Sequence, residues 1–423
     1  RSRQKPTSYI PSFTGKTYQA SANTNIEGVH FVHPDHHLDS HFAFTSVYVL
    51  TQLSMKSGLK RWKSAGEQAI STELRQLHFR DTFLPIHPKN LSKADHEQVL
   101  ESHLFLKQKR DDSIKGRMVA GGNKQRGLIP NQEASSPTAA LESVLMTSVI
   151  DALEERDVAI IDIPNAFIQT RILDDADKAV MRMRGKLAEL LVSVAPEIYS
   201  KYITTNQKGE PVLYVKLLNA LYGIMKAALL FYQRFVKDLE SIGFILNPYD
   251  PCVANKTVDG SQLTIVWHVD DLKISHKSPK TVTRMITWLQ KTYERLFDDG
   301  SGSMKVCRGR VHDYLGMTLD FQVPRQVTVG MVSYIEEIVS HFQQHDDSSS
   351  TTSTPAAEHI FRVDVNSPKL QAAQATIFHH FVAKCLFATK RSRPDIAVAV
   401  AFLTTRVKSP DQDDWKKLTR LIR

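Results

Sequence analysis

The segment Trp267-His268-Val269-Asp270-Asp271-Leu272-Lys273-Ile274-Ser275 places two adjacent carboxylates between two short apolar runs. The run Leu263 to Trp267 and the run that follows the acids predict two strands joined by a tight Asp-Asp turn. Adjacent acids at a hairpin tip repel each other, and the turn itself needs only one Asp or Asn. A divalent cation such as Mg²⁺, which binds carboxylate oxygens, would remove that repulsion. An ordinary polar turn is the alternative.

A third acid lies about a hundred residues upstream, within Asp157 to Phe167. Val158 to Ile163 is a short, β-branched apolar run that predicts a buried strand, and Asp162 stands near its end. A buried carboxylate is costly unless it is paired or bound to a metal. On its own, Asp162 is most simply an acid at a strand end. Beside the hairpin, it would complete a site of three carboxylates for two metal ions.

The order of the predicted strands and helices favours an arrangement in which Asp162 lies next to the hairpin acids. Residues 156 to 321 follow the pattern strand, helix, strand-turn-strand, helix, strand, which is the split β-α-β or ferredoxin-like plan. The two helices are expected over about 227–242 and 280–297, and the last strand over Tyr314 to Phe321. This plan predicts an α+β fold with strand 158–163 beside the hairpin.

The flanking regions differ in composition. Residues 1–42 are polar and predict an extended or disordered arm. This arm crowds together His30, His33, His36, His37 and His41 with Asp35 and Asp39, where we favour a polar loop over a metal site. In residues 43–155, Ser136-Pro137 predicts a helix start, with Ser as cap and Pro as first residue. Residues 170–215 form a charged insertion, and residues 322–423 are largely helical around a low-complexity linker at 345–356.

Bulk composition sets limits. The chain has 423 residues and a net charge of +9, from 54 Lys and Arg against 45 Asp and Glu. Such a charge suits binding to a phosphate backbone, but many proteins that bind no nucleic acid are equally basic. Its three cysteines are far apart and form no CxxC pair, so neither a disulfide framework nor a zinc cluster is indicated. No apolar run approaches the length of a membrane span. Without an initiator Met or a secretory signal, we expect an intracellular excerpt of a longer translation product.

Short motifs in a fixed order carry a family resemblance. Lys115 to Gly122 is similar to "KARLVARG", Asp162 to Phe167 to "DVKTAF", Leu218 to Lys226 to "LKKALYGLKQ", His268 to Asp271 to "YVDD", Tyr314 to Met317 to "FLGI", and Ser392 to Ile396 to "TRPDI". Together they resemble the reverse transcriptase of copia-type LTR retrotransposons over nearly the whole chain. The resemblance implies a right-hand polymerase: fingers over most of 43–155 plus the insertion near 170–215, a ferredoxin-like palm at 156–321 and a helical thumb at 322–423. An RNase H domain would be expected downstream and is absent from this sequence.

The resemblance also implies roles for residues. Asp162, Asp270 and Asp271, with the backbone of Ile163, would hold two Mg²⁺ ions, Mn²⁺ being an alternative. Phe167 would exclude a ribose 2′-hydroxyl, since its ring would clash with the added oxygen. Arg117 and Lys115 would contact triphosphate oxygens, and Lys305 would protonate the leaving pyrophosphate. The other expected contacts are, for the nucleotide, Asn165, Ala166, Tyr222 and Gly223, and, for the primer, His268, Leu315, Gly316 and Met317.

Two positions depart from the family pattern. His268 stands where the family usually has Tyr, which alters the contact expected at the primer terminus. Met225-Lys226-Ala227-Ala228 stands where the family often has Lys-Gln-Ala-Pro, and without that Pro the following helix can begin differently. Neither change removes a carboxylate, so both bear on efficiency more than on the type of reaction.

The predicted function is an RNA-directed DNA polymerase module that extends a primer on an RNA or DNA template with deoxynucleoside triphosphates. Its other partners would be the RNase H, integrase and protease parts of the same polyprotein, in a cytoplasmic virus-like particle or the nucleus. One alternative is a catalytically inactive, retroelement-derived protein that only binds nucleic acid. Another is an RNA-copying nucleotidyltransferase with a palm, against which Phe167 argues.

Overall fold

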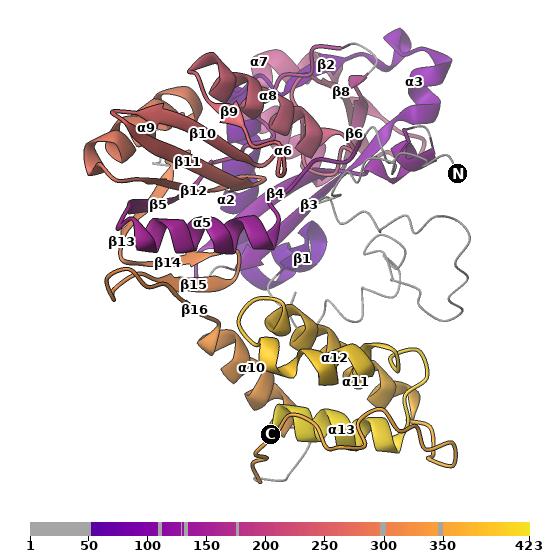
Figure 1. Cartoon of the computed structure of the whole chain (residues 1–423). Helices are drawn as coiled ribbons and strands as arrows, with labels where there is room; N and C mark the ends of the chain where they lie inside the picture. Colours follow the sequence, from indigo (N-terminus) through magenta and orange to yellow (C-terminus); the bar gives the residue numbers. More distant parts are fainter. Residues whose placement is uncertain are drawn as a thin grey trace, which may run out of the picture.

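The computed structural model describes residues 52–108, 112–127, 129–130, 134–174, 177–296, 302–345 and 350–423. Two large sheets lie side by side, and a helical unit lies below them (Figure 1). Each of these parts has its own hydrophobic core, and the ring of Phe167 packs against the cores of both sheet units. The predicted arm at 1–42, with its histidine-rich cluster, lies outside the described residues.

The six-stranded sheet carries the acidic hairpin. Its order is β13 (Lys305–Gly309), β5 (Asp157–Asp162), β12 (Asp271–His276), β11 (Ser261–His268), β10 (Val253–Val258) and β9 (Ile245–Leu246). On one face, α8 (Ala227–Ser241) and α9 (Pro279–Tyr293) bury an apolar core that includes Trp267 and Phe235, with ring centroids 5.2 Å apart. On the other face, Asp151 of α5 (Leu141–Leu153) pairs with Lys273 of β12. The predicted pairing of strand 158–163 with the hairpin is therefore confirmed, since β5 pairs antiparallel with β12.

The seven-stranded sheet has the order β1 (Gln52–Ser54), β3 (Leu100–Gln108), β6 (Val180–Arg184), β8 (Pro211–Leu217) and β2 (Phe83–Ile86), with β4 (Ile114–Ala120) on β3 and β7 (Thr204–Thr205) on β8. It joins strands from residues 52–120 with strands from the insertion near 170–215. Two helices pack on it, α2 (Met55–Phe79) and α6 (Lys186–Val194). Strand β4 crosses α2 at Gly116, where an added Cβ would lie 2.8 Å from the carbonyl oxygen of Ala69. Only a glycine fits such a close approach.

The chain then enters a small sheet and the helical unit. The small sheet contains β14 (Val311–Tyr314), β15 (Met317–Asp320) and β16 (Thr328–Gly330). The helical unit, drawn in orange and yellow in Figure 1, contains α10 (Val332–Gln343), α11 (Ala372–Thr389), η5 (Pro394–Ile396), α12 (Ala397–Thr404) and α13 (Gln412–Ile422). The remaining short elements are η1 (Pro88–Asn90), α3 (Lys93–Gln98), η2 (Gly122–Gly127), α7 (Pro196–Tyr199) and η4 (Ser200–Tyr202). Within the described ranges, no helix has the length and apolar character to cross a membrane.

Two helix boundaries differ from the sequence prediction. The helix predicted to begin at Ser136-Pro137 begins at Leu141, because the segment before it is held extended by long-range bonds: Ala140 N–H donates to Asp250 at 2.9 Å. The helix predicted to reach residue 297 ends at Tyr293, and Leu296 is exposed rather than part of the buried face.

One predicted strand and the predicted hairpin turn were also wrong. Tyr314 to Phe321 is not one strand, because Leu315 and Gly316, with φ of 50° and 79°, turn the chain between β14 and β15. The hairpin turn does not contain both acids. His268 pairs with Asp271, so Val269 and Asp270 form the turn and Asp271 is already the first residue of β12.

Candidate active site

The β11–β12 turn is strained and anchored. Val269 has a φ of 62°, which is rare for a β-branched residue and falls where a type II′ turn usually has Gly. Such a conformation costs about 1–3 kcal/mol and persists only where the surroundings enforce it. One enforcing contact is visible, since Ile163 N–H donates to the carbonyl oxygen of Asp270 at 3.0 Å. The tip that carries Asp270 is thereby tied to the end of β5.

The three predicted carboxylates come together at this edge. Asp271 lies directly opposite Asp162 across the β12–β5 pair, so both side chains project on the same face. Burial raises the pKa of Asp271 to about 6, and the charges of Asp270 and Asp162 add to it. The pKa of Asp270 is also raised, chiefly by burial and then by Asp162. The site thus concentrates negative charge that its surroundings do not fully neutralise.

In this structure the three acids do not form a complete set of metal ligands. Searched over the described ranges, the chain contains no group of three or more His, Cys, Asp or Glu side chains placed to hold a metal ion. What the structure supports is narrower: an opposed pair, Asp162 and Asp271, with Asp270 close enough to add its charge. Oxygen donors of this kind suit hard divalent cations.

Basic side chains of β4 and aromatic side chains of the segments that follow β5 and β8 lie near the same acids. The guanidinium of Arg117 on β4 lies 4.5 Å from the ring centroid of Tyr222, and that ring lies 4.7 Å from the ring of Phe167. The exposed cations Arg117 and Lys115 lower the pKa of Asp270 in part, so both reach the acidic site electrostatically. Burial and the charge of Asp270 raise the pKa of Tyr222 to about 12, which keeps its hydroxyl protonated. Cation, phenol, ring and carboxylates therefore surround one site.

Two glycines allow this approach. Ala120 N–H donates to the carbonyl oxygen of Tyr222 at 2.7 Å, which joins the end of β4 to the segment 218–226. A Cβ on Gly223, whose φ is 91°, would lie 2.0 Å from the oxygen of Ala120. A Cβ on Gly122 would lie 2.0 Å from the oxygen of Gly223. Side chains at either position would push the two segments apart.

Gly223→Ala should therefore disrupt this site severely. The positive φ alone costs about 1–3 kcal/mol, and the backbone contact adds to it. Gly209→Ala is the matched control, because Gly209 has a φ of 77° but nothing within 4 Å of its added Cβ. Thermal unfolding of both variants checks the expectation: Gly223→Ala should melt clearly lower than Gly209→Ala. Equal melting temperatures would contradict the close contact.

The other residues predicted for the nucleotide site differ in exposure. Asn165 has a φ of 54°, and its side-chain amide donates to Gln76 of α2 at 3.1 Å. Ala166 is fully buried, so its methyl group faces the core rather than a ligand. Ile163 is buried as well, with its N–H already bonded to Asp270. Lys305 is exposed on the edge strand β13, directly opposite Asp162.

The predicted primer-side residues lie along two neighbouring turns. His268 ends β11 opposite Asp271. Leu315 and exposed Gly316 form the β14–β15 turn, while Met317 is buried beneath it. The Tyr314 hydroxyl joins the two hairpins, since it lies 3.3 Å from the backbone oxygens of both Val266 and Asp271.

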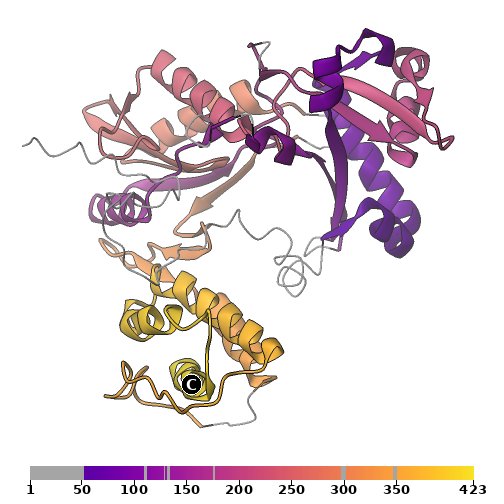
Figure 2. The same ribbon diagram turned by 90° about the vertical axis from the view of Figure 1, so that its right-hand side faces the viewer.

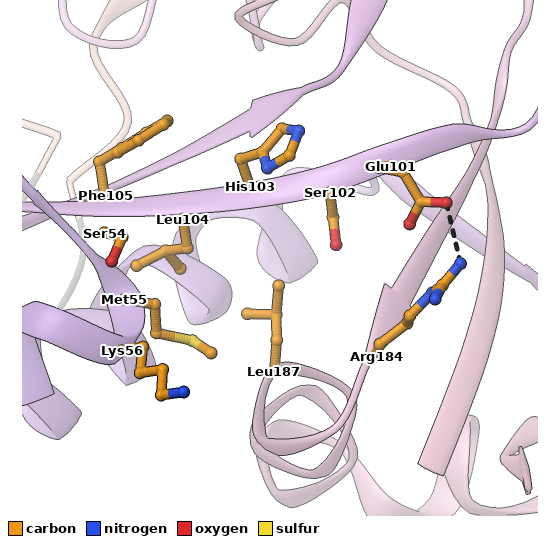
Figure 3. Close-up of a pocket in the computed structure, with 10 residues that line it drawn as sticks. All are labelled: Ser54, Met55, Lys56, Glu101, Ser102, His103, Leu104, Phe105, Arg184 and Leu187. Carbon is orange, nitrogen blue, oxygen red and sulfur yellow. Dashed lines mark hydrogen bonds and ion pairs between the residues drawn. The ribbon is translucent and has the colours of Figure 1, made fainter. Parts of the chain in front are cut away.

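A pocket of about 230 Å³ lies elsewhere (Figure 3). It is formed by the start of α2, by β3 and by Leu187 of α6, and an ion pair between Glu101 and Arg184 at 3.1 Å closes one side. None of the predicted site residues lines it. The half-buried acids Asp162, Asp270 and Asp271 lie outside this pocket.

Sequence reasoning missed two residues that shape the site. The contact of Gly122 with Gly223 could have been suspected from the Gly121-Gly122 doublet, since paired glycines often mark close backbone approach. Glu73 had no such signal. It is buried on α2, and its carboxylate accepts the N–H of Met118 at 2.9 Å, which holds β4 beneath Arg117. Burial raises the pKa of Glu73.

Comparison with known proteins gives a consistent result. The family model for reverse transcriptase (RNA-dependent DNA polymerase) matches residues 91–357, more than half of the chain. The chain is 22% identical over 84% of its length to the retrovirus-related Pol polyprotein from transposon TNT 1-94 of Nicotiana tabacum, and 23% identical over 86% to that from transposon RE1 of Arabidopsis thaliana. It is 25% identical over 49% of its length to the putative transposon Ty5-1 protein of Saccharomyces cerevisiae.

The chain is much shorter than the two plant polyproteins. It spans 25% of the tobacco protein and 22% of the Arabidopsis protein, against 63% of the yeast protein. Among solved structures, it is similar to a foamy viral protease-reverse transcriptase in complex with ds DNA, with a TM-score of 0.43 and 12% identity, over 85% of this chain and 48% of the viral one.

Proposed function

Because the chain belongs to the copia-type reverse transcriptase family, we propose that it is the polymerase module of a retrotransposon polyprotein. It would extend a primer 3′-hydroxyl on an RNA or DNA template with deoxynucleoside triphosphates. The observation that carries the proposal is the opposition of Asp162 and Asp271, with Asp270 and the contacts of Arg117 with Tyr222 and of Tyr222 with Phe167 beside them. In right-hand terms, we call the six-stranded sheet with its helices the palm, the seven-stranded sheet with its helices the fingers, and the helical unit the thumb.

The three acids fit divalent metal ions by their chemistry. Two Mg²⁺ or Mn²⁺ ions would be held by Asp162, Asp270 and Asp271 with the backbone of Ile163. The pKa values of Asp270 and Asp271 are raised, so a nearby positive charge would stabilise their ionised forms. When bound, such ions supply activation of the primer hydroxyl and charge neutralisation at the leaving pyrophosphate.

The remaining side chains would bind and orient the substrates. Exposed Arg117 and Lys115 offer their cations to the triphosphate, the forked guanidinium by two parallel hydrogen bonds. The rings of Tyr222 and Phe167 would lie beneath the sugar, and exposed Gly223 leaves the backbone open to the nucleotide. Lys305, beside Asp162, would donate a proton to the pyrophosphate. Positioning and electrostatic stabilisation would be the main catalytic terms.

The direct test is primer extension by this chain on poly(rA)/oligo(dT) with Mg²⁺. Incorporation that disappears on chelation supports the proposal. The rival proposal, a silent nucleic-acid binder, predicts binding that weakens with salt but no synthesis with Mg²⁺ or Mn²⁺. Binding without synthesis by the chain, with either Mg²⁺ or Mn²⁺, would overturn the polymerase proposal.

Phe167→Val should admit ribonucleotides. The ring is the bulk proposed to meet the 2′-oxygen, so its loss should reduce discrimination against ribonucleotides by roughly 10- to 100-fold. Single-nucleotide incorporation kinetics with paired deoxy- and ribonucleotides check this. Because Phe167 packs against both sheet cores, a melting curve should accompany the kinetics. Unchanged sugar selectivity in a folded Phe167→Val protein would rule out the gate.

The raised pKa of Asp271 gives a pH dependence with a definite sign. A carboxyl group whose pKa is raised to about 6 on folding stabilises the protein when protonated, and that contribution is lost as pH rises from the unfolded value towards 6. Without divalent cations, Asp271→Asn should therefore melt higher than wild type above pH 6, with the difference shrinking in acid. Added Mg²⁺ at neutral pH should stabilise wild type and reduce the gap. Differential scanning fluorimetry across pH measures both effects.

A further inference from the structure

One cation at the junction of palm and thumb lacks an acidic partner. Arg391 follows α11, and among the described residues no carboxylate pairs with it. By contrast, Arg393 pairs with Asp395, and Arg406 pairs with Asp411 and Asp414. The Nε of Arg391 is buried without a hydrogen-bond partner in the described part of the chain. The Oγ of Ser392 and the Nδ1 of His268 are in the same condition. Buried polar atoms are usually paired, so Arg391, its chain neighbour Ser392 and His268, which the charge of Arg391 reaches, each keep unused capacity for a hydrogen bond.

Arg391 is nevertheless held in a defined place. Its guanidinium carbon lies 3.6 Å from the ring centroid of Phe387, and its Nη1 donates to the backbone oxygen of that residue at 3.3 Å. The same ring packs on the β14–β15 turn, with its edge 3.3 Å from the position that a Cβ on Gly316 would occupy. Stacking on an aromatic face orients a guanidinium while leaving its edge free to donate.

This position is next to the carboxylate-bearing hairpin. His268, opposite Asp271, has its pKa lowered first by burial and then by the charge of Arg391, so the guanidinium lies within electrostatic reach of the β11–β12 turn. Lys115 and Arg117, proposed above for the triphosphate, come instead from the fingers. Figure 2 shows the thumb beneath the palm, apart from the fingers sheet. Arg391 therefore approaches the site from the side of the primer turn.

We propose that Arg391 is a primer-positioning residue whose guanidinium, held by Phe387 over the Leu315–Gly316 turn, binds a backbone phosphate of the primer strand near its 3′ end. Ser392 Oγ and His268 Nδ1 supply neighbouring hydrogen bonds. The inference rests on the proposed function, because it requires that a primer strand binds along the palm. To that function it adds a specific residue, Arg391, and its ligand, a backbone phosphate of the primer strand.

The test compares Arg391→Gln with Arg391→Lys and with Lys416→Gln, a control that removes the same charge from an exposed position on α13. Primer–template binding without nucleotide is measured across salt concentrations. Arg391→Gln should weaken binding about tenfold and make the slope of log Kd against log salt shallower by roughly 0.9, as expected for one lost phosphate contact. Arg391→Lys should keep the slope with intermediate affinity, and Lys416→Gln should behave as wild type. The KM for the nucleotide should not change.

A neutral linkage identifies the strand and the position. Primers with one methylphosphonate at successive linkages from the 3′ end should show one linkage that weakens wild-type binding but leaves Arg391→Gln unaffected. A Kd and slope for folded Arg391→Gln equal to wild type, or the same coupling on template linkages instead, would overturn the inference. If the chain binds with this dependence but never extends a primer, the polymerase proposal fails and the phosphate contact stands. If the chain extends primers and Arg391→Gln is normal, only the contact fails.

Discussion

Asp271→Asn should reduce primer extension by on the order of 10³-fold or more, because it removes the charge that would bind a metal ion while keeping the shape of the side chain. Asp162→Asn should have an effect of similar size, since Asp162 faces Asp271 across two paired strands. Burial and mutual repulsion already oppose ionisation of Asp271. The Asn variant should therefore be at least as stable as wild type in the absence of divalent cations, so lost activity cannot be attributed to unfolding.

The control is Asp259→Asn. Asp259 lies in the β10–β11 turn at the other end of β11, is exposed, and forms a surface ion pair with Arg284. Steady-state extension rates with saturating template and nucleotide compare the three variants, and Asp259→Asn should match wild type. Near-normal rates for Asp271→Asn would show that this carboxylate is not part of the catalytic site, whatever the family of the chain.

Asp151→Asn should destabilise the fold by about 3–5 kcal/mol, because it leaves a buried cation without its partner. Lys273 and Asp151 form an ion pair between β12 and α5, and each residue is only 1% exposed. Arg156, also buried, lies 3.8 Å from the same carboxylate. Since Lys273 lies two residues after Asp271 on β12, the pair anchors α5 to the strand that carries Asp271.

Chemical denaturation measures this effect. The control is Glu154→Gln, which removes the partially exposed partner of Arg156 and Lys277 and should cost no more than about 1 kcal/mol. A double variant, Asp151→Leu with Lys273→Met, should recover most of the lost stability, because a buried ion pair can be replaced by apolar side chains of similar size. A loss below that of Glu154→Gln would show that Lys273 is not left uncompensated.

The sequence predicted the elements of the palm well because their signals are local. Short apolar and β-branched runs identified β5, β11 and β12, and apolar spacing identified α8 and α9. The split β-α-β order then placed Asp162 opposite the hairpin. Predictions were wrong where long-range bonds override local preference. Ala140 is held extended by Asp250, which delays the start of α5, and Leu315 adopts a positive φ that no propensity favours.

By itself, the sequence determined the family and the pairing of the strand that ends at Asp162 with the hairpin that carries Asp270 and Asp271, since motif order and apolar runs can be read along the chain. Only the tertiary structure decided which residues form the hairpin turn, how closely Gly122 and Gly223 meet, and that Lys273 and Asp151 pair inside the palm. It alone brought Arg391 to the primer turn. Most of these features depend on contacts between segments far apart in the sequence, and neither hydrophobic pattern nor propensity predicts how closely two such segments approach.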